Sequence, residues 1–267
     1  MKLIVASTFR EFDGSENDRI QRVFLEGLKN LKHTDLELVV TTFGERTVKK
    51  TIEESGLKNV VFEEETKDYR FSLTNVLLNA LLYAQDLKTD YYIIWTTCDV
   101  FFESNLVEEI LKVEKLSKKG TSIISHPHQI SKDMEEFHNG TYVEHGPNDG
   151  IDFIGFSSRL ISNEFIGDIK NNFFSDWGVF EHFLVAVAVK NRFDRYNLYP
   201  VNKARKICND RTINNENDEY FRMSLNKNWP VLKKYIYNGK ISSRYFSLVY
   251  CNFKFKVAGG LHSTLKY

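Results

Sequence analysis

The chain has 267 residues, of which 42% are hydrophobic and 27% are charged. These values are typical of an ordinary globular protein and exclude an intrinsically disordered chain. The net charge is zero, but residues 194–267 contain 14 Lys or Arg against 5 Asp or Glu, so this segment carries +9 and the first 193 residues carry −9. Such asymmetry is typical either of a solvated basic face or of a segment that meets an anionic partner.

No apolar run approaches the ~20 residues of a membrane-spanning helix, and the N-terminal residues MKLIVASTFR lack the pattern of a signal peptide. We therefore expect a cytoplasmic protein. The three cysteines, Cys98, Cys208 and Cys251, are odd in number and far apart. They predict neither a disulfide framework nor a zinc site with paired ligands.

The first ninety-six residues alternate short apolar strands with helices. The predicted strands are KLIVAST, LELVVTTFG, NVVFEEE and YYIIWT. Between them, helical spacing of apolar residues predicts one helix over 17–32, a shorter one over 46–55 that ends at Gly56, and a third over 72–87 with Ser72 as its N-cap.

The next hundred residues continue the alternation. We expect a helix over 104–120 with Ser104 as N-cap, a strand TSIISH, a polar loop over 131–150, a strand within GIDFIGFSSRLI and an apolar helix within FFSDWGVFEHFLVAVAVKN. This pattern favours an α/β fold, with a Rossmann-like, mostly parallel sheet flanked by helices. We expect one catalytic domain over 1–193 and a basic, α-rich C-terminal extension over 194–267 that packs on it.

A single carboxylate ends the most apolar of these strands. The sequence YYIIWT is followed by Thr97, Cys98 and Asp99. Ligands of such sheets bind outside the carboxyl ends of the strands, and carboxylate oxygen is the ligand that Mg²⁺ and Mn²⁺ prefer. Asp99 beside Thr97 therefore indicates a divalent-cation site. The alternative is a turn or capping aspartate before the next helix.

At this point the order of elements resembles that of a known family. A first strand ending in Ser-Thr-Phe-Arg (7–10), a helix with Asn75 and Asn79, and an aromatic-aliphatic strand ending in an acid together resemble the GT-A fold glycosyltransferases of the nucleotide-diphospho-sugar type, over about residues 1–190. In that family the strand ends in an Asp-x-Asp motif, which holds a metal on the diphosphate of the sugar nucleotide. Here the first acid is replaced by Thr97, so metal dependence is either kept through Asp99 or weakened.

The resemblance implies a site for a nucleotide-diphospho-sugar donor with Mn²⁺ or Mg²⁺ as cofactor. Its implied nucleotide-sugar-binding residues are Thr8, Arg10, Arg70, Asn75, Asn79, Thr97 and Lys266. Its implied metal ligands are Asp99 and His262. His262 follows Gly259 and Gly260, which would allow the backbone to approach a ligand. A surface histidine is the alternative.

Three carboxylates are candidate catalytic residues. Related transferases carry an Asp-bearing segment that lines the acceptor or sugar pocket, which implies Asp152; Asp149 beside Gly150 is equally typical of a turn. In inverting transferases of this fold, a carboxylate near a helix start deprotonates the acceptor hydroxyl. This implies Asp176 first and Glu181 second, with a plain N-cap as the alternative for Asp176. A retaining mechanism requires no such base.

The sequence therefore predicts a glycosyltransferase that moves a sugar from a nucleotide-diphosphate donor to a hydroxyl acceptor in glycan or cell-surface polysaccharide synthesis. One alternative is a sugar-phosphate nucleotidyltransferase, although ASTFREFDGSEN contains only one glycine for its expected Gly-rich loop. Another is a catalytically silent domain that binds a sugar nucleotide or a glycan. We expect a glycan or a lipid-linked acceptor. The basic tail either packs as core strands or contacts the inner face of the membrane, and it lacks a nucleic-acid-binding motif.

Overall fold

The structure is a computed structural model in which two compact units are formed, one by residues 1–176 with 193–211 and the other by 177–192 with 212–267. It describes residues 1–31, 35–64, 72–125, 127–130, 136, 139–141, 143–147, 152–170, 180–191, 193–198, 204–207, 228–230 and 232–233. The domain boundary expected after residue 193 stays a prediction. Strands β10 (Asp194–Asn197) and β11 (Arg205–Ile207), which follow it, lie in the first unit.

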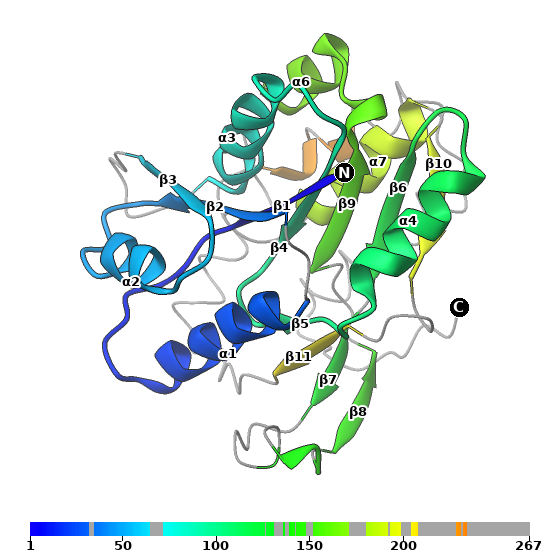
Figure 1. The fold of residues 1–267 in the computed structure, drawn as a ribbon. Helices are drawn as coiled ribbons and strands as arrows, with labels where there is room; N and C mark the ends of the chain where they lie inside the picture. The colour runs from blue at the N-terminus through cyan, green and yellow to red at the C-terminus, as the bar shows by residue number, and fades with distance from the viewer. Residues whose placement is uncertain are drawn as a thin grey trace. The chain divides into compact units, whose positions relative to one another are not determined.

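The first unit contains a seven-stranded sheet with the order β10-β6-β9-β4-β1-β2-β3 (Figure 1). All neighbouring strands are parallel except β9, which is antiparallel to β4 and β6. The mostly parallel α/β sheet predicted from the sequence is therefore confirmed. The strands are β1 (Lys2–Ser7), β2 (Leu36–Thr42), β3 (Asn59–Glu63), β4 (Tyr91–Thr96), β6 (Thr121–Ser125), β9 (Phe153–Ser157) and β10.

Helices cover both faces of this sheet because its strands are apolar on both sides. The side chains of Leu3, Val5 and Ile94 share one core with α1 (Glu16–Asn30), α2 (Val48–Glu54) and α4 (Leu106–Leu116). On the other face, α3 (Leu73–Gln85) contacts β1, β2, β4 and α6 (Asn163–Lys170), as Figure 1 shows. A 3₁₀ turn, η1 (Ser158–Leu160), follows β9.

Two of the helix starts test the predicted caps. The prediction for Ser72 is confirmed, since its hydroxyl accepts the backbone N–H of Asn75 at 3.2 Å. The prediction for Ser104 is wrong, because α4 is preceded by Asn105 and has no side-chain cap. Ser104 instead lies inside a turn that Leu106 closes by donating its backbone N–H to the carbonyl of Glu103 at 3.1 Å.

A second, smaller sheet lies in the first unit and has the order β5-β11-β7-β8. Its strands are β5 (Val100–Phe101), β11, β7 (His128–Ile130) and β8 (Glu144–Pro147). The loop expected over 131–150 is therefore wrong for residues 144–147, whose sequence EHGP has little intrinsic strand preference and becomes a strand by pairing with β7. Because β5 directly follows the end of β4, this sheet brings β11 beside Asp99.

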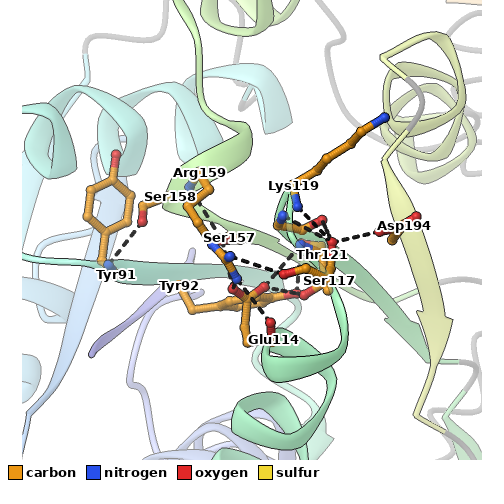
Figure 2. Close-up of polar contacts among 11 residues, drawn as sticks. Tyr91, Tyr92, Glu114, Ser117, Lys119, Thr121, Ser157, Ser158, Arg159 and Asp194 are labelled. Atoms are coloured by element: carbon orange, nitrogen blue, oxygen red, sulfur yellow. Dashed lines mark hydrogen bonds and ion pairs between the residues drawn. The ribbon is translucent and has the colours of Figure 1, made fainter.

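A polar network fixes the edge of the large sheet at which the parallel strands begin (Figure 2). The carboxylate of Glu114 accepts hydrogen bonds from the backbone N–H of Thr121 at 3.0 Å and from the hydroxyl of Ser157 at 3.0 Å, and it pairs with Arg159. The buried hydroxyl of Tyr92 donates to the carbonyl of Thr121 at 3.2 Å. These contacts join α4 to β4, β6 and β9 and so hold the antiparallel strand in register.

The described part of the second unit is mainly α7 (Phe180–Lys190), an apolar helix with Phe180 and Phe183 buried. Within the described ranges, no helix combines the length and the apolar character needed to cross a bilayer. The basic, helix-rich character expected for 194–267 concerns mostly residues that lie outside the described part.

Candidate donor site

The sheet topology has a switch point between β1 and β4. In the strand order, β2 and β3 follow β1 on one side. The chain then crosses over, so that β4 pairs with β1 on its other side. At such a switch point the loops after the two strands diverge, and ligands bind between them. Residues 8–10 follow β1 and residues 97–99 follow β4, so two of the segments singled out in the sequence meet at this point.

Gln21 holds both loops together. Its side-chain oxygen accepts the backbone N–H of Arg10 at 2.6 Å, and its Nε2 donates to the carbonyl of Arg10 at 3.2 Å. The same oxygen lies 3.6 Å from Sγ of Cys98, which donates to it. Gln21 is only 2% exposed, and its role was missed in the sequence. The available signal was a polar residue in the apolar stripe of the first helix, one turn before Phe24.

The charge of Arg10 reaches the loop after β4. Arg10 is exposed after β1. Burial, followed by the negative charge of Asp99, raises the pKa of the Cys98 thiol to about 12, and Arg10 and Lys206 oppose this rise with their positive charges. The raised pKa favours the protonated thiol at neutral pH.

Two side-chain oxygens after β4 are buried without hydrogen-bond partners within the described part of the chain. They are Oγ1 of Thr97 and Oδ1 of Asp99. The other carboxylate oxygen of Asp99 lies 3.6 Å from the ammonium group of Lys206. Buried polar atoms without partners are uncommon in proteins, and they concentrate where a ligand, an ion or water completes the structure.

Asp152 lies next to this segment because β9 runs antiparallel to β4. Its carbonyl accepts the backbone N–H of Thr97 at 3.3 Å and the hydroxyl of Thr96 at 3.0 Å. Its carboxylate lies 2.9 Å from Nζ of Lys206. The structure therefore brings together Asp99 and Asp152, two acids that the sequence analysis assigned to different roles.

Lys206 is the functional candidate that the sequence analysis missed. It lies on β11 opposite Val100, and the neighbouring N–H of Ile207 donates to the carbonyl of Asp99 at 3.4 Å. Only the general excess of basic residues after position 193 indicated an anionic partner there. No local pattern indicates that a three-residue strand from that segment pairs beside Asp99.

The described residues do not fit a divalent cation as they stand. Mg²⁺ and Mn²⁺ need several oxygen ligands, and the described ranges contain no group of three His, Cys, Asp or Glu side chains that could hold a metal. The ammonium group of Lys206 lies close to both available carboxylates. His262 lies outside the described residues, so the expected Mn²⁺ or Mg²⁺ cofactor stays a prediction.

Asn79 and Asn75 occupy different positions on α3. Asn79 is buried, and its Nδ2 donates to Oγ1 of Thr41 at 3.2 Å and to Oε1 of Glu64 at 3.0 Å. It thus links the ends of β2 and β3. Asn75 lies in the first turn of α3 and is half-buried, as is Thr8 after β1. Direct contact of these three side chains with a nucleotide stays a prediction.

The remaining predicted residues are not placed at this site. Arg70, Asp176, His262 and Lys266 lie outside the described residues. Glu181 lies in the first turn of α7, in the second unit. The roles expected for these five residues stay predictions.

A surface depression of about 310 Å³ lies elsewhere in the first unit. It is lined by Arg22, Leu25, Glu26, Lys29, Thr51, Glu54 and Ser55. These residues belong to the later turns of α1 and to α2 with its C-cap, and none of them follows a strand of the sheet. The depression is therefore separate from the switch point between β1 and β4.

The parallel sheet with one inserted antiparallel strand, its flanking helices and its switch point define a GT-A-like α/β fold. No protein-family model matches the sequence, and no curated protein matches it. Among solved structures, the chain is similar to residues 1–349 of TarS from S. aureus in complex with UDP. The TM-score is 0.52 at 11% identity, and the match covers 98% of this chain and 71% of that one. At this identity the likeness shows the fold, and the GT-A-like fold expected from the sequence is confirmed.

Two further solved structures cover most of the chain. A Desulfovibrio desulfuricans protein assigned as a nucleotide-diphospho-sugar transferase gives a TM-score of 0.47 at 13% identity, over 88% of this chain and 99% of that one. The 4-diphosphocytidyl-2C-methyl-D-erythritol synthase of Anaerococcus prevotii gives a TM-score of 0.45 at 11% identity. The match covers 85% of this chain and 95% of that one.

Proposed function

We propose that the protein is a glycosyltransferase that moves a sugar from a nucleotide-diphosphate donor to a hydroxyl acceptor. The observation that carries this proposal is the charged cluster of Asp99, Asp152 and Lys206 at the carboxyl end of β4, beside the loop that carries Arg10. The fold places this cluster at the position where α/β sheets bind nucleotides and other phosphorylated ligands. The similarity of the fold to that of TarS, whose structure contains UDP, supports the same class of donor.

The geometry suits a donor that spans the switch point. In this proposal the base and ribose lie against residues 8–10, where Gln21 fixes the backbone of Arg10, and the diphosphate lies near the loop after β4. Arg10 and Lys206 are the cations that the described part of this region offers to the phosphates. Thr97, whose buried Oγ1 has no hydrogen-bond partner among the described residues, is a further candidate contact.

In the proposed reaction, the oxygen of the acceptor hydroxyl forms a bond to the anomeric carbon of the donor. The bond from that carbon to the diphosphate oxygen breaks, and its electron pair leaves with the diphosphate. Fixed positive charge stabilises the diphosphate as it departs. In an inverting reaction a carboxylate takes the hydroxyl proton, and Asp152, Asp176 and Glu181 are the proposed candidates. Asp152 is the one that the structure places beside Asp99.

The proposal extends to the acceptor. We assign it to the glycans or lipid-linked sugars of cell-surface polysaccharide synthesis, with the basic segment after residue 193 as the part that meets the anionic groups of a lipid-linked acceptor or of the membrane.

The direct test is a screen of UDP-, GDP-, CMP- and dTDP-sugars for binding and for hydrolysis, with Mn²⁺ and with a chelator. We expect one nucleotide class to bind and to be hydrolysed slowly without an acceptor. Arg10→Ala should weaken its binding by about fivefold, and Arg19→Ala, which removes an exposed arginine from α1, should leave it unchanged. If none of these donors binds, the proposal is wrong.

A further inference from the structure

The ammonium group of Lys206 lies where two carboxylates converge. Its Nζ is 2.9 Å from Oδ2 of Asp152 and 3.6 Å from Oδ2 of Asp99. Asp99 lies three residues after the end of β4, and Asp152 directly precedes β9, which pairs antiparallel with β4. The side chain of Lys206 remains 19% exposed, while those of Asp99 and Asp152 are 12% and 9% exposed. The positive group is therefore the member of the cluster that is most accessible to a ligand.

The backbone of Lys206 is held on both sides. Residues of β11 pair with β5 on one side and with β7 on the other, and Lys206 lies opposite Val100 and Gln129. The adjacent Arg205 forms ion pairs with Glu103 at 3.2 Å and with Glu144 at 3.3 Å. This strand cannot move away from the end of β4 without losing its backbone hydrogen bonds and these ion pairs, so Lys206 is a fixed part of the site.

We propose that Lys206 is the resident cation of the donor site and binds the diphosphate of a nucleoside diphosphate without a divalent metal. This inference rests on the proposed function and names the group that meets the leaving diphosphate. The charges support it, because the partly exposed Lys206 lies against both Asp99 and Asp152 and the exposed Arg10 adds a second positive charge near the loop after β4. A fixed ammonium group in a partly desolvated site stabilises a phosphate oxyanion directly. An Mg²⁺ or Mn²⁺ ion would first require several oxygen ligands to be ordered around it.

The experiment measures binding of UDP, GDP, CDP and ADP by calorimetry, in EDTA and in Mn²⁺. For the nucleotide that binds, we expect the wild-type dissociation constant in EDTA to lie within about threefold of that in Mn²⁺. Lys206→Met should weaken binding in EDTA by about tenfold or more, whereas Lys206→Arg, which keeps the charge, should keep most of the affinity. Lys112→Met on α4 is the matched control, since the exposed Lys112 pairs with the exposed Glu108 and with Glu109 on its own helix, away from the switch point.

A second readout keeps the proposal testable if Lys206→Met loses stability. Without the ammonium group, Asp99 and Asp152 lose the cation that lies against both of them, so the variant should gain affinity for Mn²⁺, measured from the electron paramagnetic resonance signal of free Mn²⁺. Mn²⁺ should then restore both nucleotide binding and thermal stability in Lys206→Met, and it should have little effect on the wild type. A purely structural ion pair would change the stability of the variant but not the nucleotide affinity of its folded fraction.

The outcomes separate this inference from the proposed function. If the wild type binds a nucleoside diphosphate only when Mn²⁺ or Mg²⁺ is present, Lys206 is not the resident cation, while the transferase proposal survives. If Lys206→Met binds as tightly as the wild type in EDTA, the inference is likewise overturned. If no nucleotide binds under either condition, both the inference and the proposed function are wrong.

Discussion

The side-chain amide of Gln21 makes two hydrogen bonds with the backbone of Arg10, at 2.6 and 3.2 Å. Through them a buried residue of α1 sets the conformation of the loop that leaves β1. Because the same amide oxygen accepts from Cys98, one side chain contacts both loops at the switch point. The stability of the fold and the shape of the proposed donor site are therefore expected to be coupled at this residue.

Gln21→Leu tests this coupling. Leucine keeps the size of the side chain but leaves the backbone N–H and carbonyl of Arg10 without partners, so we expect a loss of roughly 1–3 kcal/mol in the free energy of unfolding. Nucleotide affinity should fall as well, since the loop is no longer fixed. Urea denaturation and calorimetry measure the two effects. An unchanged affinity in the folded variant would show that the loop does not contribute to binding.

Gly155 lies at the centre of the sheet where no side chain fits. A Cβ atom at this position would lie 2.6 Å from Cε1 of Tyr92 and 2.7 Å from Cγ1 of Ile123. Gly155→Ala should therefore destabilise the protein by roughly 1–3 kcal/mol through overpacking. Gly167→Ala in α6 is the control, since no atom lies within 4 Å of its Cβ, and helix propensity predicts a gain of about 0.5–1 kcal/mol. Equal effects of the two substitutions in thermal unfolding would contradict the tight packing of β9.

The network around Glu114 makes a distinct contribution to stability (Figure 2). Glu114→Ala removes the acceptor for Thr121 and Ser157 and the partner of Arg159, so we expect a loss of about 2 kcal/mol. Glu108→Ala, on the same helix, breaks only an exposed ion pair with Lys112 and should cost less than about 0.5 kcal/mol. Chemical denaturation of both variants gives the comparison. A similar loss in the two variants would mean that the network does not fix the sheet edge.

The ion pair of Lys2 and Glu37 makes stability depend on pH. Burial by itself raises the pKa of Glu37, but hydrogen bonds from Lys2, at 2.6 Å, and from Tyr83 outweigh it and lower the pKa below the ordinary value of 4.5. A lowered pKa in the folded state means that the stabilisation is complete above pH 4.5 and is lost as the pH falls through the lowered value.

Glu37→Gln should therefore reduce the free energy of unfolding by about 1 kcal/mol at pH 7, and the difference from the wild type should shrink as the pH falls below 4.5. Urea denaturation at a series of pH values measures it. A difference that stays constant between pH 7 and pH 3 would show that the charge of Glu37 is not responsible.

The sequence predicted the large sheet well because its strands are apolar on both faces and its helices have clear spacing. It also indicated the segments after β1 and β4 as candidate site loops, since a polar break after a buried strand is visible locally, and their role in binding stays a prediction. It did not predict β8 or the position of Lys206. Both depend on pairing between short segments that are far apart in the chain, and the local composition of EHGP or RKI contains no information about such partners.

For Gln21, the sequence indicated the position of the residue but not its contacts. Its position on the buried face of α1 was visible in the helical spacing, but its two bonds to Arg10 depend on the path of a loop without regular structure. Asn79 is similar, since the sequence placed it on α3 beside the donor site while its bonds to Thr41 and Glu64 depend on how β2 and β3 end.

The central claim is that a nucleotide donor binds at the switch point between β1 and β4, and hydrogen–deuterium exchange with and without a nucleoside diphosphate locates that site most directly. With the nucleotide bound, we expect slower exchange in peptides that cover residues 7–15, 96–101 and 205–207. Exchange should stay unchanged in peptides that cover residues 22–29 and 51–55, which line the surface depression. Protection at the depression alone, or no protection with any nucleoside diphosphate, would contradict the account.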